Sequence, residues 1–276
     1  MNAPLSTYQS LPAKIYTSGN TCAKCSSRER CLPHGLDERS VAQLDRIIGK
    51  RHWVERNELL LRVGEPFHCL YIIHGGQFKT FRDNAHGKQH VMGFHMAGEI
   101  LGMNAISTGI HDSNAMAFED SEVCEVPFAQ LQILCANIPA LQQHFHRLLS
   151  QEINRDQRVM RFLGNSAEQR FATFLLDLSS RFAARGYSRH DFTVLMSRED
   201  IGNYIGLTME SVSRLMSKFR RQGWISTDGK DLHILNHGAI EALANGETME
   251  TVASIDALTE RTTALLSSIS KAASRA

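Results

Sequence analysis

Three cysteines near the start of the chain have the spacing of a metal-binding loop. Cys22, Cys25 and Cys31 follow the pattern C-x2-C-x5-C within the segment CAKCSSRERC, and thiolates this close in sequence can converge on one metal centre. The chain has six cysteines, and clustered cysteines in a reducing cytosol indicate metal or redox chemistry rather than disulfides. The loop therefore predicts a bound metal centre.

A fourth ligand is needed, because cubane clusters are usually held by four thiolates. The remaining cysteines are Cys69, Cys124 and Cys135. Cys124 lies in the alternating segment Ser121–Pro127, which is typical of a strand and could close the site from a rigid element. We interpret Cys69 and Cys135 as small buried hydrophobic residues. Zinc would accept the same four sulfurs, so the ligand set alone does not name the metal.

The segment that follows the cysteine loop predicts many short strands. Between about Trp53 and Phe128, apolar runs are broken by turn signals: CLYII precedes HGG, and residues 91–96 precede AGE. Short strands separated by glycine turns are typical of a β-barrel or jelly roll. The first residues, rich in Ser, Thr, Asn and Pro, predict a flexible arm.

One long helix is predicted next. Asn137 can cap it, Pro139 fits its first turn, and no Gly or Pro follows until Gly164. A heptad-like stripe runs along it, with an acidic residue in one slot: Leu149, Ile153, Asp156, Met160 and Leu163. The alternative is that this stripe packs on its own domain. Two copies of Asp156 across a two-fold seam would repel, so we expect a dimer whose association a second event controls.

Two capped helices joined by a short turn are predicted between residues 196 and 223. Ser197 opens the first with an approximate capping box, Gly206 ends it, and Thr208 caps the second. A hairpin wing is predicted around the turn at 227–230. This order of elements indicates a winged helix-turn-helix.

The exposed face of the second of these helices has the residue types of a major-groove reader. Arg214 can bind guanine through two hydrogen bonds, Glu210 can accept one from cytosine, and Ser213 can do either. The alternative is an ordinary solvated charged face, but the short glycine turn between capped helices favours DNA binding. The cations further along are better placed for phosphates, and they are Lys218, Arg220 and Arg221.

Composition limits the class of protein. The chain has 276 residues, of which 42% are hydrophobic, enough to fill two cores. Residues 161–240 carry 11 Lys or Arg and 8 Asp or Glu, while the net charge of the chain is +1, so the DNA prediction depends on motif geometry rather than charge. No apolar run approaches the roughly 20 residues of a membrane span, and the first residues lack a secretory signal. We expect a cytoplasmic protein with no membrane partner.

The combined pattern resembles the CRP/FNR regulators, and within them the fumarate and nitrate reduction regulators. The resemblance runs from about Cys22 to Leu235 and is carried by CAKCSSRERC, GFHMAGEILGMNAI, SEVCEVPF, QEINRDQ and DIGNYIGLTMESVSRL. It implies an α+β fold, with an N-terminal cyclic-nucleotide-binding-type β-roll, a long dimerisation helix and a C-terminal winged helix-turn-helix. The expected parts are a flexible arm (1–21), a sensory domain (22–136), the dimerisation helix (137–164), the winged-helix domain (165–245) and a tail (246–276).

The resemblance also implies a cofactor. The matching ligands of one [4Fe-4S] cluster per monomer would be Cys22, Cys25, Cys31 and Cys124, which selects iron over zinc. The intact cluster would favour a homodimer, oxygen would convert it to a [2Fe-2S] form, and dimer and DNA affinity would then fall. Arg30, beside Cys31, departs from relatives that often have an apolar residue there.

Partners follow from the same resemblance. Glu210, Ser213 and Arg214 match base-reading positions, so the expected target is double-stranded DNA with an inverted repeat similar to TTGAT–ATCAA, at genes for anaerobic growth. Ile153 and Asp156 match dimer-helix positions. The loop around Gly87 matches a surface that contacts RNA polymerase, as expected of an activator.

Other functions lack part of their machinery. A regulator of the same fold that binds a cyclic nucleotide would need a phosphate-pairing arginine where residues 111–115 read HDSNA. A thiol enzyme built on Cys124 or Cys69 and a histidine has no supporting spacing, so we expect no enzyme. A zinc-stapled DNA-binding protein stays an alternative. A haem sensor would leave the cysteine loop without a role, although the β-region offers His68, His74, His90 and His95.

Overall fold

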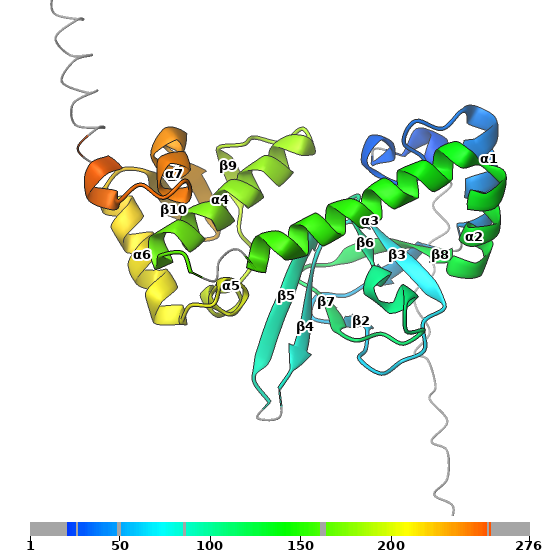
Figure 1. Ribbon diagram of the computed structural model, residues 1–276, viewed down its shortest axis with the longest axis horizontal. Helices are drawn as coiled ribbons and strands as arrows, with labels where there is room; N and C mark the ends of the chain where they lie inside the picture. The colour runs from blue at the N-terminus through cyan, green and yellow to red at the C-terminus, as the bar shows by residue number, and fades with distance from the viewer. Residues whose placement is uncertain are drawn as a thin grey trace, which may run out of the picture. The chain divides into compact units, whose positions relative to one another are not determined.

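The computed structural model describes residues 21–25, 27–48, 51–84, 87–160, 164–252 and 254, without the side chains at 156 and 158–160. Most of the predicted arm and tail, Leu163, and the side chains of Asp156 and Met160 therefore lie outside the described residues. The chain divides into two compact units, 1–153 and 154–276 (Figure 1). In the described part of the chain, none of the helices combines the length and apolar character needed to cross a membrane.

The first unit begins with the cysteine loop and a short helix. Two 3-10 turns, η1 (Cys22–Lys24) and η2 (Arg28–Arg30), precede α1 (Glu38–Ile47). Asp37 caps α1, because its carboxylate accepts a hydrogen bond from the Ser40 backbone N–H at 2.7 Å. Since the loop itself has little regular structure, its position depends on contacts with other elements.

Short antiparallel strands follow, as predicted. Within the described part of the first unit they form two four-stranded sheets, ordered β1-β8-β3-β6 and β2-β7-β4-β5 (Figure 1). Side chains from both sheets share one core, including Phe78, Ile73 and Val123. A third 3-10 turn, η3 (Met103–Ile106), follows β6. The strands are β1 (Arg51–Val54), β2 (Leu59–Leu61), β3 (Cys69–Gly75), β4 (Gln77–Asp83), β5 (Gln89–Met96), β6 (Ile100–Leu101), β7 (Asn114–Ala117) and β8 (Ser121–Pro127).

A second core joins the cysteine loop to helices. The loop contributes Cys31 and Leu32, and α1 contributes Leu44. They pack with residues of α2 (Phe128–Asn137) and of α3 (Pro139–Met160), among them Leu141. Leu32, Leu44 and Leu141 are fully buried, so the end of the cysteine loop is part of the hydrophobic interior.

The long predicted helix exists, but its expected cap is wrong. Asn137 is the last residue of α2, and its side-chain amide donates to the Ile133 carbonyl at 2.9 Å. Its polar side chain therefore serves the end of one helix rather than the start of the next. Ile138 separates the two helices. The sequence prediction therefore placed Asn137 before the long helix, whereas it belongs to the preceding helix.

The second unit is a winged helix-turn-helix. A capping box of Ser166 and Gln169 opens its first helix. As predicted, another capping box opens α5 at Ser197, Gly206 ends it with a φ of +69°, and Thr208 caps α6. The predicted wing is present, and a third strand that was not predicted completes a sheet ordered β10-β11-β9. The elements are α4 (Ala167–Ala184), β9 (Asp191–Thr193), α5 (Arg198–Ile205), α6 (Met209–Arg221), β10 (Ile225–Asp228), β11 (Asp231–Ile234) and α7 (His237–Ala244).

Tight packing sets the position of α6 within this unit. The rings of Phe171 and Phe219 lie 5.2 Å apart, and those of Phe219 and Trp224 lie 5.5 Å apart. All three rings are buried. Gly202 of α5 faces the turn: a Cβ there would lie 2.7 Å from the Leu207 carbonyl oxygen. The close approach of α5 to the turn therefore requires glycine at this position.

Gly202→Ala tests that requirement. We expect it to destabilise the second unit by about 1–3 kcal/mol, the usual cost of overpacking a core. Urea unfolding followed by tryptophan fluorescence, in a Trp53→Phe background so that Trp224 reports, measures the change. The control is Gly238→Ala in the first turn of α7, where the nearest atom to a new Cβ lies 3.7 Å away and alanine should not destabilise the unit. Equal stabilities of the two variants would contradict the packing argument.

Candidate functional site

The first two cysteines are tied to neighbouring elements. The Cys22 backbone N–H donates to an Asp45 carboxylate oxygen of α1 at 2.7 Å. The Cys25 Sγ lies 3.5 Å from Nδ1 of His74 in β3. These contacts hold the two ends of the C-x2-C segment against different elements of the same unit.

The end of the loop has contacts of its own. Gly98, between β5 and β6, has a φ of +89°, and a Cβ there would lie 3.2 Å from the Arg30 Cβ, so the loop passes directly over this glycine. The Cys31 carbonyl oxygen lies 3.1 Å from Nε2 of His144 in α3. No local sequence pattern indicated His144, because 113 residues separate it from Cys31.

The four candidate thiols affect one another electrostatically. Burial raises the pKa of Cys22 and Cys31 well above the ordinary thiol value. For Cys22, Asp45 and the charges of Cys31 and Cys124 raise the pKa further. For Cys31, the charges of Cys124 and Cys25 raise it further. Burial also raises the pKa of Cys124 to about 11, with a further contribution from Cys25. A hydrogen bond with His74 lowers the pKa of Cys25. Cys31 and Cys124 therefore interact electrostatically with each other and with both Cys22 and Cys25.

Positive charge adjoins two of these thiols. Arg51, paired with Cys124 in the β1–β8 register, lowers the pKa of Cys124 against the larger effect of burial. Its Nη1 lies 3.4 Å from Nε2 of His74 and 3.6 Å from Glu122. Arg51 can therefore offset negative charge on Cys124 and Cys25. No local sequence pattern indicated a role for this cation.

The four thiols of Cys22, Cys25, Cys31 and Cys124 have the chemistry of iron–sulfur ligands, but they do not yet converge on one point. All six cysteines are free thiols, and four of them share one electrostatic environment. Among the described residues, no group of three or more Cys, His, Asp or Glu side chains is arranged to hold a metal ion. The loop must therefore tighten if these thiols bind one centre.

The other two cysteines differ from each other. Cys135 is buried in the core of the first unit, as predicted. The prediction for Cys69 was wrong, because this residue is only partly buried and its Sγ donates to a Glu125 carboxylate oxygen at 3.1 Å. Cys69 is the first residue of β3 and pairs with Pro127 at the end of β8, where the sheet ends. Burial and Glu125 raise its pKa to about 12.

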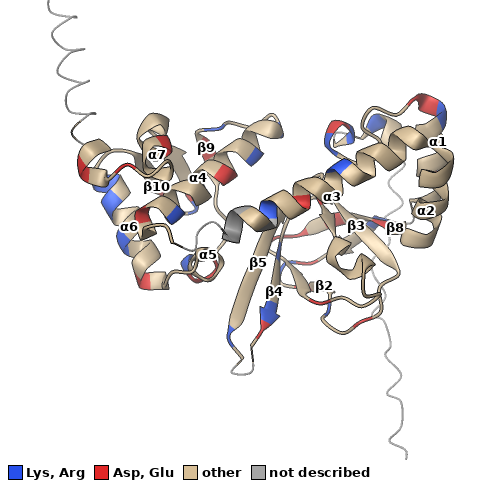
Figure 2. Cartoon of the chain, viewed as in Figure 1, with Lys and Arg blue, Asp and Glu red and all other residues tan. Residues whose placement is uncertain are grey.

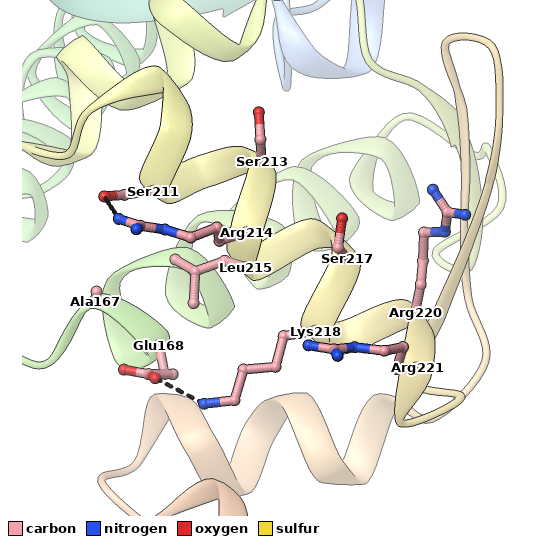
Figure 3. A pocket seen from close by; sticks show the side chains of 10 residues that line it. All are labelled: Ala167, Glu168, Ser211, Ser213, Arg214, Leu215, Ser217, Lys218, Arg220 and Arg221. Carbon is pink, nitrogen blue, oxygen red and sulfur yellow. Dashed lines mark hydrogen bonds and ion pairs between the residues drawn. The ribbon is translucent and has the colours of Figure 1, made fainter.

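The predicted recognition residues share one face of α6. Figure 2 shows Lys and Arg concentrated on this helix within its unit. The face borders an open hollow of about 930 Å³ between α6 and the start of α4 (Figure 3). Arg214 donates to the Ser211 hydroxyl at 3.2 Å, and Arg198 of α5 donates to the Ser213 hydroxyl at 3.3 Å. Glu210 is fully exposed in the first turn of α6.

The three predicted phosphate-binding cations are not equivalent. The Lys218 Nζ lies 3.1 Å from a Glu168 carboxylate oxygen of α4, and Figure 3 shows this pair in the hollow. Arg220 and Arg221 are exposed, and Arg220 points away from Lys218 in the same view. Against the opposing effect of burial, hydrogen bonds from its own backbone and from Lys218 lower the pKa of Glu168. Lys218 is thus partly neutralised.

The described part of the predicted dimer stripe is mixed. Leu149 is partly buried against the core of the first unit, whereas Ile153 is 57% exposed. Of the two apolar stripe residues whose side chains are described, Leu149 packs inside its own unit and Ile153 is exposed to solvent.

Two loops bear on the remaining predictions. Gly87 is exposed in the turn between β4 and β5, where its N–H donates to the Asn84 carbonyl at 2.9 Å. In the stretch 111–115, Asp112 pairs with Arg82 at 3.2 Å. This stretch contains no arginine, and the cation that reaches it is paired with a carboxylate, which argues against a bound phosphodiester.

Comparison with known proteins covers both units. The cyclic nucleotide-binding domain model matches residues 51–137, and the Crp-like helix-turn-helix domain model matches residues 169–243. The chain is 41% identical over 224 residues to the fumarate and nitrate reduction regulatory protein of Salmonella typhimurium, covering 81% of this chain and 90% of that protein. It is 39% identical over 227 residues to the transcriptional activator protein Anr of Pseudomonas aeruginosa, covering 82% and 93%.

A solved structure shows the same fold. FixK2 from Bradyrhizobium japonicum superposes with a TM-score of 0.66 at 25% identity, covering 72% of this chain and 98% of that one. The relatives are transcription regulators rather than enzymes, which confirms the prediction on that point. The chain therefore belongs to the CRP/FNR family of DNA-binding transcription regulators, with the β-roll and helix-turn-helix predicted for that family.

Proposed function

We propose that this protein is an oxygen-responsive activator of anaerobic genes in the cytoplasm, holding one [4Fe-4S] cluster on Cys22, Cys25, Cys31 and Cys124. The observation that carries the proposal is the chain of contacts that brings the loop to Cys124: Cys25 contacts His74, His74 contacts Arg51, and Arg51 is paired with Cys124 across β1 and β8. The names of the relatives, which refer to fumarate and nitrate reduction, support the anaerobic role.

The residues around the thiols suit them to this task. Buried thiolates are unfavourable unless positive charge lies near them. The iron ions of such a cluster would supply that positive charge, and the cluster would also make the site sensitive to oxygen. Arg51 and His74 adjoin Cys124 and Cys25 and would stabilise their deprotonated forms. The Asp45 contact keeps the Cys22 backbone in place while the loop closes.

The DNA-binding half would read a two-fold site. Two copies of α6 in a homodimer would enter successive major grooves of a repeat similar to TTGAT–ATCAA. Glu210, Ser213 and Arg214 would contact base edges, and Arg220 and Arg221 would contact phosphates. Lys218 would do so with reduced strength, since Glu168 holds it. The loop around Gly87 would contact RNA polymerase.

Dimerisation would occur along α3. Ile153 offers an exposed apolar side chain on this helix, and Asp156 follows it on the heptad stripe. Two aspartates facing each other would oppose association, so the monomer would predominate until the sensory unit favours the dimer.

Alanine variants of single cysteines test the ligand set. We expect Cys22→Ala, Cys25→Ala, Cys31→Ala and Cys124→Ala each to lower iron and sulfide per monomer at least tenfold, because a cubane usually needs four thiolates. Cys69→Ala and Cys135→Ala are matched controls and should retain wild-type content. Iron and sulfide are measured after anaerobic purification. Stoichiometric zinc without sulfide in the wild type would contradict the cluster and support a zinc-stapled regulator.

Asp156→Ala tests the control of dimerisation. Because it removes the repulsion across the seam, this variant should form dimers in air, where the wild type should be monomeric. Sedimentation velocity measures the state. The neighbouring exposed residue provides the control, Gln157→Ala, which should stay monomeric. A monomeric Asp156→Ala protein would show that Asp156 does not govern association.

Glu168→Gln tests the state of Lys218. Releasing Lys218 for a phosphate should raise DNA affinity severalfold and steepen the slope of log K against log salt by about 0.9 per protomer, or about 1.8 for the dimer. Fluorescence anisotropy over a salt series gives both quantities. Adding Lys218→Met should cancel the gain, and Glu241→Gln in α7 should have no effect. An unchanged salt slope in Glu168→Gln would mean that Lys218 does not reach the DNA.

A further inference from the structure

A buried histidine connects the cysteine loop to α3. His144 is 7% exposed, and its Nε2 lies 3.1 Å from the Cys31 carbonyl oxygen. A carbonyl oxygen can only accept a hydrogen bond, so Nε2 carries the hydrogen and donates it. One bond therefore joins the backbone of the last loop cysteine to a helix 113 residues away.

The same ring contacts the loop beyond Cys31. The rings of His144 and His34 lie 5.2 Å apart, and the His34 Nδ1 lies 3.3 Å from Glu29 on the other side of Cys31. Leu32 and Phe145, the neighbours of Cys31 and His144 in sequence, are buried in the same core. The backbone around Cys31 and this turn of α3 are thus packed as one body.

The contacts of the other two loop cysteines connect to elements other than α3. Cys22 is bonded to Asp45 in α1, and Cys25 contacts His74 in β3. The Cys31 bond leads to the helix that carries Ile153, nine residues after His144. At 1.5 Å per residue, that distance along α3 is about 14 Å.

We propose that His144 is the positioning residue through which the cysteine loop controls α3. This inference rests on the proposed function. Any change in what Cys31 holds displaces the Cys31 carbonyl; the hydrogen bond passes that displacement to α3, and the rigid helix carries it to the dimer stripe at Ile153. Packed side chains, hydrogen bonds and rigid helices are the physical elements that carry coupling between distant sites.

Three variants separate this role from simple packing. His144→Leu fills the site without a donor, and His144→Gln retains an N–H that can reach a carbonyl. His146→Leu is the matched control, because His146 is exposed two residues further along α3. For each protein, sedimentation gives the dimer dissociation constant anaerobically and after exposure to air, and iron analysis gives the cluster content.

The ratio of the two dissociation constants measures the coupling. We expect a ratio of at least about tenfold for the wild type, His146→Leu and His144→Gln. For His144→Leu we expect a ratio within about twofold of one, with iron per monomer unchanged. A wild-type ratio in His144→Leu would overturn the inference, and so would equal loss of coupling in His144→Leu and His144→Gln.

A second readout does not need the cluster. Amide hydrogen exchange in cluster-free protein should show faster exchange at residues 32–36 and 145–149 in His144→Leu than in the wild type, with His144→Gln close to the wild type. Unchanged exchange would overturn the inference even if His144→Leu failed to take up iron. A wild type that binds no iron would refute the proposed function, while this comparison would still decide the role of His144.

Discussion

Thiolates that repel one another cannot share a buried place unless positive charge lies among them. In the first unit this constraint applies to Cys22, Cys31 and Cys124, because burial raises the pKa of each of these thiols. Without a metal the thiols stay protonated and the loop depends on its contacts with α1, β3 and α3. With a cluster, the charge of these groups is balanced and the loop can tighten. In the proposed sensor, the free energy of holding the cysteine loop closed therefore depends on whether the loop binds a cluster.

The DNA-binding unit depends on steric constraints instead. Gly202 and Gly206 allow α5 to end and turn sharply, and the Phe171, Phe219 and Trp224 rings fix α6 on α4. The two glycine constraints are local in sequence, whereas the contact between Phe171 and Phe219 joins distant segments. The capping box of α5, the glycine at its end and the wing hairpin could therefore be predicted residue by residue, and so could the strand that carries Cys124.

Contacts between distant segments could not be predicted. No local pattern relates His144 to Cys31 across 113 residues, or Lys218 to Glu168 across 50. Asn137 was assigned to the wrong helix because an asparagine can bond at either end of one. Cys69 was placed in the core because cysteine is usually buried, whereas its position at the end of a strand leaves it beside Glu125. The choice of iron over zinc came from resemblance, since both metals accept thiolates.

The central claim is that the cluster controls the dimer. Sedimentation velocity of the anaerobically purified wild type, recorded at 280 nm and near 400 nm before and after admission of air, follows the oligomeric state and the cluster in one sample. The account predicts a dimer that absorbs at both wavelengths, with about four irons per monomer, and that becomes a monomer as the 400 nm band bleaches. A colourless protein whose oligomeric state is the same with and without air would contradict it.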